Sequence, residues 1–230
     1  MTALYLIINV ASFSIPFLYS FERRMNYIQY WKAVFLAILI VAIPFLIWDV
    51  WFTNIGVWGF NTAYLLGPTI VNLPFEEVLF FFFIPYASIF THYALLYFFP
   101  KLVLPKKVTK GMTIFLLLIA ILIVIFNYDK WYTFVNFSVF SLLLLYALAV
   151  KDTNINSFYI TFLVVLIPFF IVNGLLTGSF IEEQVVWYNN AENLGIRLGT
   201  VPIEDAFYAF SMLYAAIILI EKFKPFFKKK

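Results

Sequence analysis

Long apolar segments alternate with short polar ones along the whole chain. Seven of these segments are predicted to be transmembrane helices, at about residues 3–19, 31–50, 74–99, 112–126, 131–150, 157–176 and 202–220. Most approach the roughly 20 residues that a helix needs to cross the hydrocarbon core of a bilayer. The uncharged stretch 51–73 is rich in Asn and Gly, so we expect a re-entrant or interfacial loop there. The pattern predicts an all-α polytopic membrane protein.

Composition indicates the same class and narrows the chemistry. The chain of 230 residues is 64% hydrophobic, 22% aromatic and only 12% charged, which leaves too little polar surface for a soluble domain. It has no cysteine and a single histidine, His92, which argues against disulfides and against a histidine-rich metal site. Nucleotide-binding glycine loops and aspartate-rich diphosphate motifs are missing from the sequence. We therefore expect no cofactor, no metal and no nucleic acid partner.

Two short acidic motifs stand out among the remaining polar positions. The first, Leu73-Pro74-Phe75-Glu76-Glu77, opens the third apolar segment. The second, Val201-Pro202-Ile203-Glu204-Asp205, opens the seventh segment, 128 positions later. Asn61 and Asn189 match at the same offset. These matched positions predict an internal repeat.

The repeat predicts a layout of three helices, one connector helix and three more helices. The expected boundaries are 1–100 for the first three-helix repeat, 101–130 for a basic loop with the connector, and 131–230 for the second repeat with a basic tail. After three membrane crossings the chain is on the side opposite its start, and the connector helix returns it. The fifth helix therefore begins on the same side as the first. The two repeats therefore run parallel, about an axis along the membrane normal. Both acidic motifs are expected at one depth, facing one cavity.

Basic residues set the expected orientation. Of the 15 Lys and Arg residues, only Lys130 and Arg197 fall on the side that carries the acidic motifs. The others, including the terminal Lys228, Lys229 and Lys230, fall on the opposite side, which the positive-inside rule makes cytoplasmic. We expect an integral protein of the cytoplasmic membrane with its N-terminus outside and its C-terminus in the cytoplasm.

The acidic residues of the motifs are the candidate catalytic groups: Glu76, Glu77, Glu204 and Asp205. A structural explanation also exists, because an acid in the first turn of a helix meets free N–H groups and the positive end of the helix dipole. Two matched pairs beside membrane segments favour acid–base chemistry, since charged groups are costly there. Neighbouring helix positions point about 100° apart, so one acid of each pair is expected to face the bundle and the other the headgroups or the long polar loop. A buried carboxylic acid can donate a proton, and a second carboxylate can accept one.

Aromatic residues crowd both motifs and indicate what the acid protonates. Aromatic faces stabilise cations without acting as bases, which suits protonation of an alkene and a carbocation intermediate. They are also common in lipid-facing helices, where they only pack. The candidates for substrate binding or for tuning the acids are Asp49 and its match Asn173, Asn61, Asn189, Phe80, Tyr208, Trp187 and Arg197. Arg197 either pairs with an acid of the second motif or is a loop cation.

These residues resemble those of a known family, the small membrane lycopene cyclases of bacteria, archaea and fungi. The resemblance rests on residues 73–77 with the phenylalanines that follow, on residues 195–208, and on Val186-Trp187-Tyr188-Asn189. In that family the halves occur as two short chains or fused into one, and this chain resembles the fused form. The resemblance implies that the four acids close the linear ends of lycopene into β-ionone rings by protonation, carbocation cyclisation and deprotonation, without net redox change. The implied partners are lycopene and membrane lipid, and a second copy of the chain is a further candidate.

Two other functions fit the same pattern. Parallel repeats of three helices also describe small membrane transporters, in which paired acids couple proton movement. The aromatic excess and the placement of the acids towards one face favour the cyclase over a transporter. A carotenoid hydratase would use the same protonation but quench the cation with water, and would need a wetter cavity.

Overall fold

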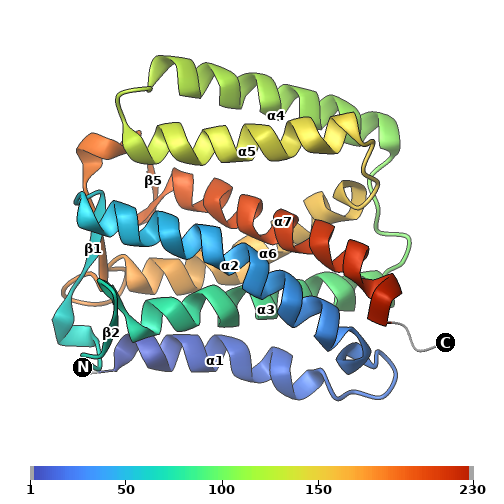
Figure 1. Ribbon diagram of the computed structural model, residues 1–230, viewed down its shortest axis with the longest axis horizontal. Helices are drawn as coiled ribbons and strands as arrows, with labels where there is room; N and C mark the ends of the chain where they lie inside the picture. The colour runs from blue at the N-terminus through green and yellow to red at the C-terminus, as the bar shows by residue number, and fades with distance from the viewer. Residues whose placement is uncertain (1–2, 228–230) are drawn as a thin grey trace.

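Seven α-helices form the body of the protein in the computed structural model, which describes residues 3–227. They are α1 (Leu4–Tyr19), α2 (Trp31–Asn54), α3 (Phe75–Phe98), α4 (Lys106–Phe126), α5 (Trp131–Ala149), α6 (Ile155–Leu176) and α7 (Ile203–Phe227). Successive helices run in opposite directions, so α1, α3, α5 and α7 all begin at the same end of the molecule (Figure 1).

Short strands gather at that end, which we call the strand end. Three antiparallel pairs form there, β1 (Trp58–Phe60) with β4 (Val186–Tyr188), β2 (Thr69–Ile70) with β3 (Leu73–Pro74), and β5 (Arg197–Leu198) with β6 (Val201–Pro202). The 3₁₀ turns η2 (Thr62–Tyr64) and η3 (Asn190–Glu192) lie between these strands in the chain, and η1 (Tyr27–Tyr30) precedes α2. The strands lead directly into α3 and α7, so they place the acidic motifs at the strand end.

The helix surfaces identify an integral membrane protein. Six helices, α2 to α7, are long and apolar enough to cross a membrane, whereas the apolar α1 has 16 residues. Phe115, Leu118 and Leu122 on α4 are all more than half exposed, as are Ile167 and Ile171 on α6. Residues three or four apart lie on one helix face, so these rows are apolar stripes suited to lipid.

Several predicted boundaries need correction. The helix α4 begins at Lys106 instead of about residue 112, and α7 continues to Phe227 instead of ending near residue 220. Hydropathy identifies only the part of a helix that lies inside hydrocarbon. The helix can continue beyond it, because lysine side chains reach the polar surface with their charged ends. The stretch predicted as a loop from residue 51 starts with the last turn of α2, and its remainder forms β1 to β3. The terminal Lys228, Lys229 and Lys230 lie outside the described residues.

The two halves of the strand end have the same internal pairing. In the β2–β3 pair, Thr69 lies opposite Pro74, and in the β5–β6 pair, Arg197 lies opposite Pro202. Each position of the second pair follows its counterpart by 128 residues. The equal spacing seen in the sequence therefore corresponds to equal local structure.

The pair β1–β4 joins the two halves across the middle of the strand end. Gly59 lies opposite Trp187, which is 128 residues further along the chain. The flanking backbone bonds are also matched, because Asn61 donates its N–H to the Val185 carbonyl and Asn189 donates to the Val57 carbonyl, each at 2.8 Å. A Cβ on Gly59 would collide with the indole ring of Trp187, which explains glycine at this position.

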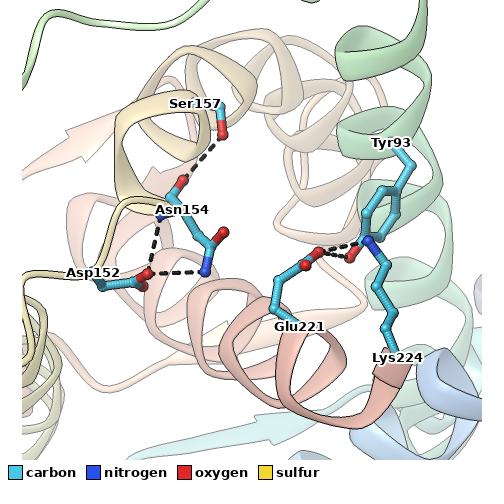
Figure 2. Close-up of polar contacts among 6 residues, drawn as sticks. All are labelled: Tyr93, Asp152, Asn154, Ser157, Glu221 and Lys224. Atoms are coloured by element: carbon cyan, nitrogen blue, oxygen red, sulfur yellow. Dashed lines mark hydrogen bonds and ion pairs between the residues drawn. The ribbon is translucent and has the colours of Figure 1, made fainter. Parts of the chain in front are cut away.

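A second contact between matched positions lies at the opposite end of the bundle. Tyr93 on α3 donates its hydroxyl to Glu221 Oε1 on α7 at 2.6 Å, and the two positions again differ by 128 (Figure 2). Lys224 Nζ bonds the same oxygen at 2.7 Å and lies 4.1 Å from the centre of the Tyr93 ring. This network ties α3 to α7 at that end.

The packing between the halves is unequal. The helix α2 packs closely along α7, but the matching pair, α6 and α3, has far fewer contacts. A cavity lies between α3 and α6. The interface between α2 and α7 is therefore tightly packed, and we call it the closed interface. The matching interface between α3 and α6 is loosely packed, and we call it the open interface.

Candidate active site

The central cavity lies between α1, α3, α6 and α7 and has a volume of about 250 Å³. Along α3 its lining residues run from Glu77 through Phe80, Ile84 and Ser88 to Thr91. Fourteen residues of helix span about 21 Å, so the cavity reaches deep into the bundle from the strand end. It is long and narrow, with mainly apolar walls.

The carboxyl groups of the cavity gather at the strand end. Three carboxyl side chains line it there, those of Glu77 on α3, Asp205 on α7 and Asp49 on α2. All three residues are less than 9% exposed. The second acid of each motif therefore reaches one shared space, as the parallel repeat predicted.

A tyrosine from the helix that opens each half binds the second acid. Tyr5 on α1 donates its hydroxyl to Glu77 Oε2 at 2.5 Å, and Tyr132 on α5 donates to Asp205 Oδ1 at 2.5 Å. Asp205 receives a further bond from the hydroxyl of Tyr188 in β4, at 2.9 Å to Oδ2. Both oxygens of Asp205 are thus occupied by phenol donors.

Tyr188 lies outside the membrane-spanning segments and is a neutral donor. Burial raises the pKa of its phenol well above the ordinary value of 10.0, and the nearby carboxyl group of Asp205 raises that pKa further. An ionised phenol in this place would have to share an apolar cavity with carboxylates. The hydroxyl of Tyr188 therefore stays protonated and is the donor of its hydrogen bond to Asp205.

The first acids of the motifs have a different position. Glu76 Oε1 accepts the backbone N–H of Leu66 at 2.6 Å, and Glu204 Oε1 accepts that of Leu194 at 2.7 Å. Both carboxyl groups are fully buried, outside the lining of the cavity. Of the two expected surroundings, headgroups or loop, the first acids therefore have the loop. The loop folds back over the first acid and uses it to satisfy a buried N–H group.

Matched asparagines support the same turns. Asn9 on α1 donates to the Glu76 carbonyl oxygen at 2.7 Å, and Asn136 on α5 donates to that of Glu204 at 2.6 Å. Carbonyl groups in the first turn of a helix already accept an intrahelical N–H, and each asparagine uses the second lone pair of the oxygen. These contacts hold the first turns of α3 and α7 in place, and with them the second acids.

Asp49 has no acidic counterpart in the second half. Its Oδ1 accepts the indole N–H of Trp58 at 2.5 Å and, more weakly, the hydroxyl of Thr53 at 3.4 Å. Its Oδ2 is buried without a hydrogen-bond partner in the described structure. The matched Asn173 also lines the cavity, but its amide donates to the Phe169 carbonyl oxygen of its own helix.

Aromatic faces surround the three carboxyl groups. Trp58, Phe80 and Tyr208 line the cavity, and the ring of Tyr208 lies 4.8 Å from that of Trp48. The hydroxyl of Tyr208 is buried and has no hydrogen-bond partner in residues 3–227. The predicted contribution of Phe80 and Tyr208 to the cavity wall is thus consistent with their position.

Four other candidates lie away from the cavity lining. Asn61 and Asn189 cap η2 and η3 by accepting the N–H groups two residues on, each at 3.0 Å, and Trp187 packs over Gly59. Arg197 does not pair with an acid of the second motif, because its guanidinium donates to Thr200 O and Asn190 Oδ1. These four residues shape the strand end.

Sequence analysis missed the hydrogen-bond partners of the acids. Tyr5, Tyr132, Trp58 and Tyr188 all contact a cavity carboxyl group. A signal was present, because a tyrosine precedes an asparagine by four positions at Tyr5 and again at Tyr132. Both side chains of such a pair lie on one helix face.

The cavity is acidic, and the positive charge of Arg197 acts on Asp205 from outside its lining, where the guanidinium lies 5.8 Å from the centre of the Tyr188 ring. Within residues 3–227, no lysine or arginine forms an ion pair with Glu77, Asp205 or Asp49. The same range holds no group of three or more histidine, aspartate and glutamate side chains arranged for a metal ion. His92 is 2% exposed and contacts Thr161, so it is a packed polar residue away from the cavity. The chemistry available to the site is proton transfer beside aromatic rings.

These features define a membrane enzyme class with carboxyl groups at the end of a long apolar cavity. A family model described as lycopene cyclase matches residues 2–95 and again residues 129–223, one match for each half. The chain belongs to the lycopene cyclase family and is a carotenoid cyclase with a lipophilic carotenoid substrate. No curated protein and no solved structure matches the chain.

Proposed function

We propose that this protein is a lycopene β-cyclase that closes the linear ends of lycopene into β-ionone rings without net redox change. The observation that carries the proposal is the shared cavity, in which Glu77 and Asp205 from the two motifs face one apolar, aromatic space. Family membership supplies the substrate class. Glu76 and Glu204 have a structural part in this proposal, since they hold the loops that position the second acids.

The reaction needs one acid and one base. A carboxylic acid gives its proton to the terminal double bond of lycopene, and a tertiary carbocation forms. The electrons of a nearby double bond attack that cation and close the ring, and a carboxylate removes a proton from a ring carbon. One proton enters and one leaves, so no co-reactant is consumed. Tyr208 and Trp58 stabilise the cation through their ring faces and keep out water that would trap it as an alcohol.

The polyene is placed along the open interface between α3 and α6. One end reaches the carboxyl groups, and the chain lies against Phe80, Ile84 and Ser88 of α3 and Phe169 of α6. The loose contact between α1 and α6 supplies a lateral entrance from the lipid phase. Since the matching interface between α2 and α7 is closed, one polyene end is processed at a time.

The proposed architecture is a seven-span protein with parallel repeats at 1–100 and 131–230, joined by the connector region 101–130. The contacts between matched positions support it: Gly59 with Trp187 at one end and Tyr93 with Glu221 at the other. An axis through both contacts runs along the helices, as parallel repeats require. The short α1 is the seventh span, since it packs along α3 and binds Glu77.

The proposed orientation puts the strand end outside and the C-terminus in the cytoplasm. Lys106, Lys107 and Lys110 at the start of α4 and Lys222 and Lys224 near the end of α7 all lie at the opposite end of the bundle. The positive-inside rule assigns that end to the cytoplasm of a cytoplasmic membrane. A C-terminal reporter that is active only outside the cytoplasm is expected to stay silent, and an active one would reverse this topology.

The test of the function is co-expression with enzymes that make lycopene. Red lycopene is expected to turn into yellow-orange carotene with β-ionone rings, identified by chromatography and mass. Products heavier by one water would instead identify a hydratase. Unchanged lycopene with well-expressed protein in its native lipid would contradict the proposed substrate, and a transporter would then be the class to examine.

A further inference from the structure

We propose that Asp49 and Glu77 share one proton, and that this pair is the proton donor while Asp205 is the acceptor. The inference rests on the proposed cyclase function and assigns roles within it. Asp49 acts here as a positioning residue, because its charge keeps the transferable proton on Glu77. The assignment follows from four features of the cavity.

The first feature is the presence of two carboxyl groups in one cavity without an ion-paired cation. Asp49 and Glu77 line the same apolar cavity, at 1% and 8% exposure, and no basic side chain of the described residues pairs with either. Two carboxylates cannot both be charged in such a place, because each charge opposes the other and burial opposes both. One proton shared by the pair relieves both costs.

The second feature decides which partner carries the charge. Asp49 Oδ1 accepts a short bond from the Trp58 indole, which can only donate, and a second bond from Thr53. Glu77 receives one bond, from Tyr5 to Oε2, and one oxygen of each acid, Asp49 Oδ2 and Glu77 Oε1, has no partner in residues 3–227. Two donors stabilise the charged form of Asp49. Glu77 therefore carries the proton, on a carboxyl group that lines the substrate space.

The third feature is the environment of Asp205. Phenol hydroxyls of Tyr132 and Tyr188 donate to both of its oxygens, so no oxygen is left without a donor. This arrangement suits a carboxylate that waits for a proton. The acceptor accordingly belongs to the second half of the chain and the donor to the first.

The fourth feature is the asymmetry of the repeat. The second half has Asn173 where the first has Asp49, so only the first half can form a carboxyl pair. Glu77 gives its proton to the terminal double bond, the ring closes, and Asp205 takes the ring proton. The proton then returns from Asp205 to the Glu77–Asp49 pair, so the cycle needs no outside reagent.

The key variant is Asp49→Asn, which gives the first half the residue found in the second. It keeps an acceptor oxygen for Trp58 but removes the charge, and we expect lycopene conversion to fall at least 10-fold. Asp49→Glu is expected to recover part of the activity. The control is Asp152→Asn, the same chemical change at a carboxyl group that also accepts a phenol, that of Tyr214, but does not line the cavity.

A spectroscopic measurement separates this role from a purely structural one. Infrared spectra of purified protein at neutral pH are expected to show the carbonyl band of a protonated carboxylic acid, and Glu77→Gln should remove it. In Asp49→Asn the band should weaken while the melting temperature stays within a few degrees of wild type. If Asp49→Asn does not accumulate, Trp58→Phe, which removes the indole donor from Asp49, is expected to shift the band and lower conversion.

Position is tested by a double variant. Asp49→Asn with Asn173→Asp returns the charge to the other side of the cavity and is expected not to restore conversion. Rescue by this exchange, a band that survives Glu77→Gln, or full activity with an unchanged band in Asp49→Asn would each overturn the donor assignment. Failure of the proposed function is distinct, because wild-type protein would then leave lycopene unchanged whatever its infrared spectrum shows.

Discussion

At the scale of single residues, adjacent acids of one motif have different surroundings. Glu77 and Asp205 line the cavity, while Glu76 and Glu204 are buried behind the loop that they hold. The side chains are of one chemical kind, so position alone distinguishes their roles. This difference leads to a direct test.

Glu77→Gln and Asp205→Asn are expected to lower conversion of lycopene by about 100-fold or more, the usual range for loss of a general acid or base. Glu76→Gln and Glu204→Gln keep the oxygen that accepts the loop N–H, so they should retain most activity. Pigment analysis after matched expression checks the contrast. Equal losses in all four variants would mean that the first acids also reach the substrate.

The sequence located the acids but could not separate these roles. Carboxyl groups beside apolar segments stand out because they are costly to bury, which made both motifs visible. The separation depends on loops that fold back to place the N–H groups of Leu66 and Leu194 against the first acids. Such contacts depend on tertiary structure, and helix periodicity carries no information about them.

At the scale of elements, helices could be predicted far better than the strand end. Apolar segments of membrane length mark helices directly. The strands are two or three residues long, too short for an alternating pattern to appear. The pair β1–β4, which connects the two halves at the strand end, could therefore not be predicted from the sequence.

The centre of the β1–β4 pair provides a stability test. Gly59→Ala places a methyl group against the Trp187 ring, and overpacking of this kind costs about 1–3 kcal/mol. We expect a lower melting temperature and weaker conversion, because Trp58 and Tyr188 on these strands bind cavity acids. The control is Gly111→Ala on α4, where a Cβ meets no neighbour and alanine favours the helix by about 1 kcal/mol. An unchanged melting temperature for Gly59→Ala would mean that this strand pair opens readily.

The open interface between α3 and α6 provides an element-scale test of substrate placement. Ser88→Phe adds a ring to the cavity wall, more than two helix turns from Glu77, and leaves the carboxyl groups untouched. We expect conversion of lycopene to fall strongly while shorter polyenes with the same end group are still cyclised. The matched control is Leu118→Phe on the exposed face of α4. Equal loss for long and short substrates would place the polyene elsewhere.

At the scale of the whole molecule, the cavity with its three carboxyl groups is divided between two similar halves. Glu77 and Asp49 come from the first and Asp205 from the second, and neither half encloses the cavity alone. The closed contact of α2 with α7 and the β1–β4 pair hold the halves together. The connector helix α4 packs on α5 and contributes no residue to the cavity lining, so it serves assembly and topology.

This division predicts that the chain can be cut between α3 and α4. Residues 1–100 and 101–230 expressed as separate chains are expected to assemble and to convert lycopene, while neither converts it alone. The cut leaves α4 with α5 and α6, which it contacts through Thr113 and Tyr159, and keeps its lysines at the start of the second chain. Those lysines direct the start of α4 to the cytoplasm, so α7 should insert in its native direction.

Variants of the separate chains then test whether the site is shared. Glu77→Gln in the first chain with a wild-type second chain should be inactive, and so should Asp205→Asn in the second with a wild-type first. Mixing the two variant chains should also give no product, because every assembled cavity lacks both of its proton carriers. Conversion by residues 101–230 alone would contradict a site made by both halves. Conversion by the mixed variants would mean that neither Glu77 nor Asp205 is needed, and it would contradict the proposed site.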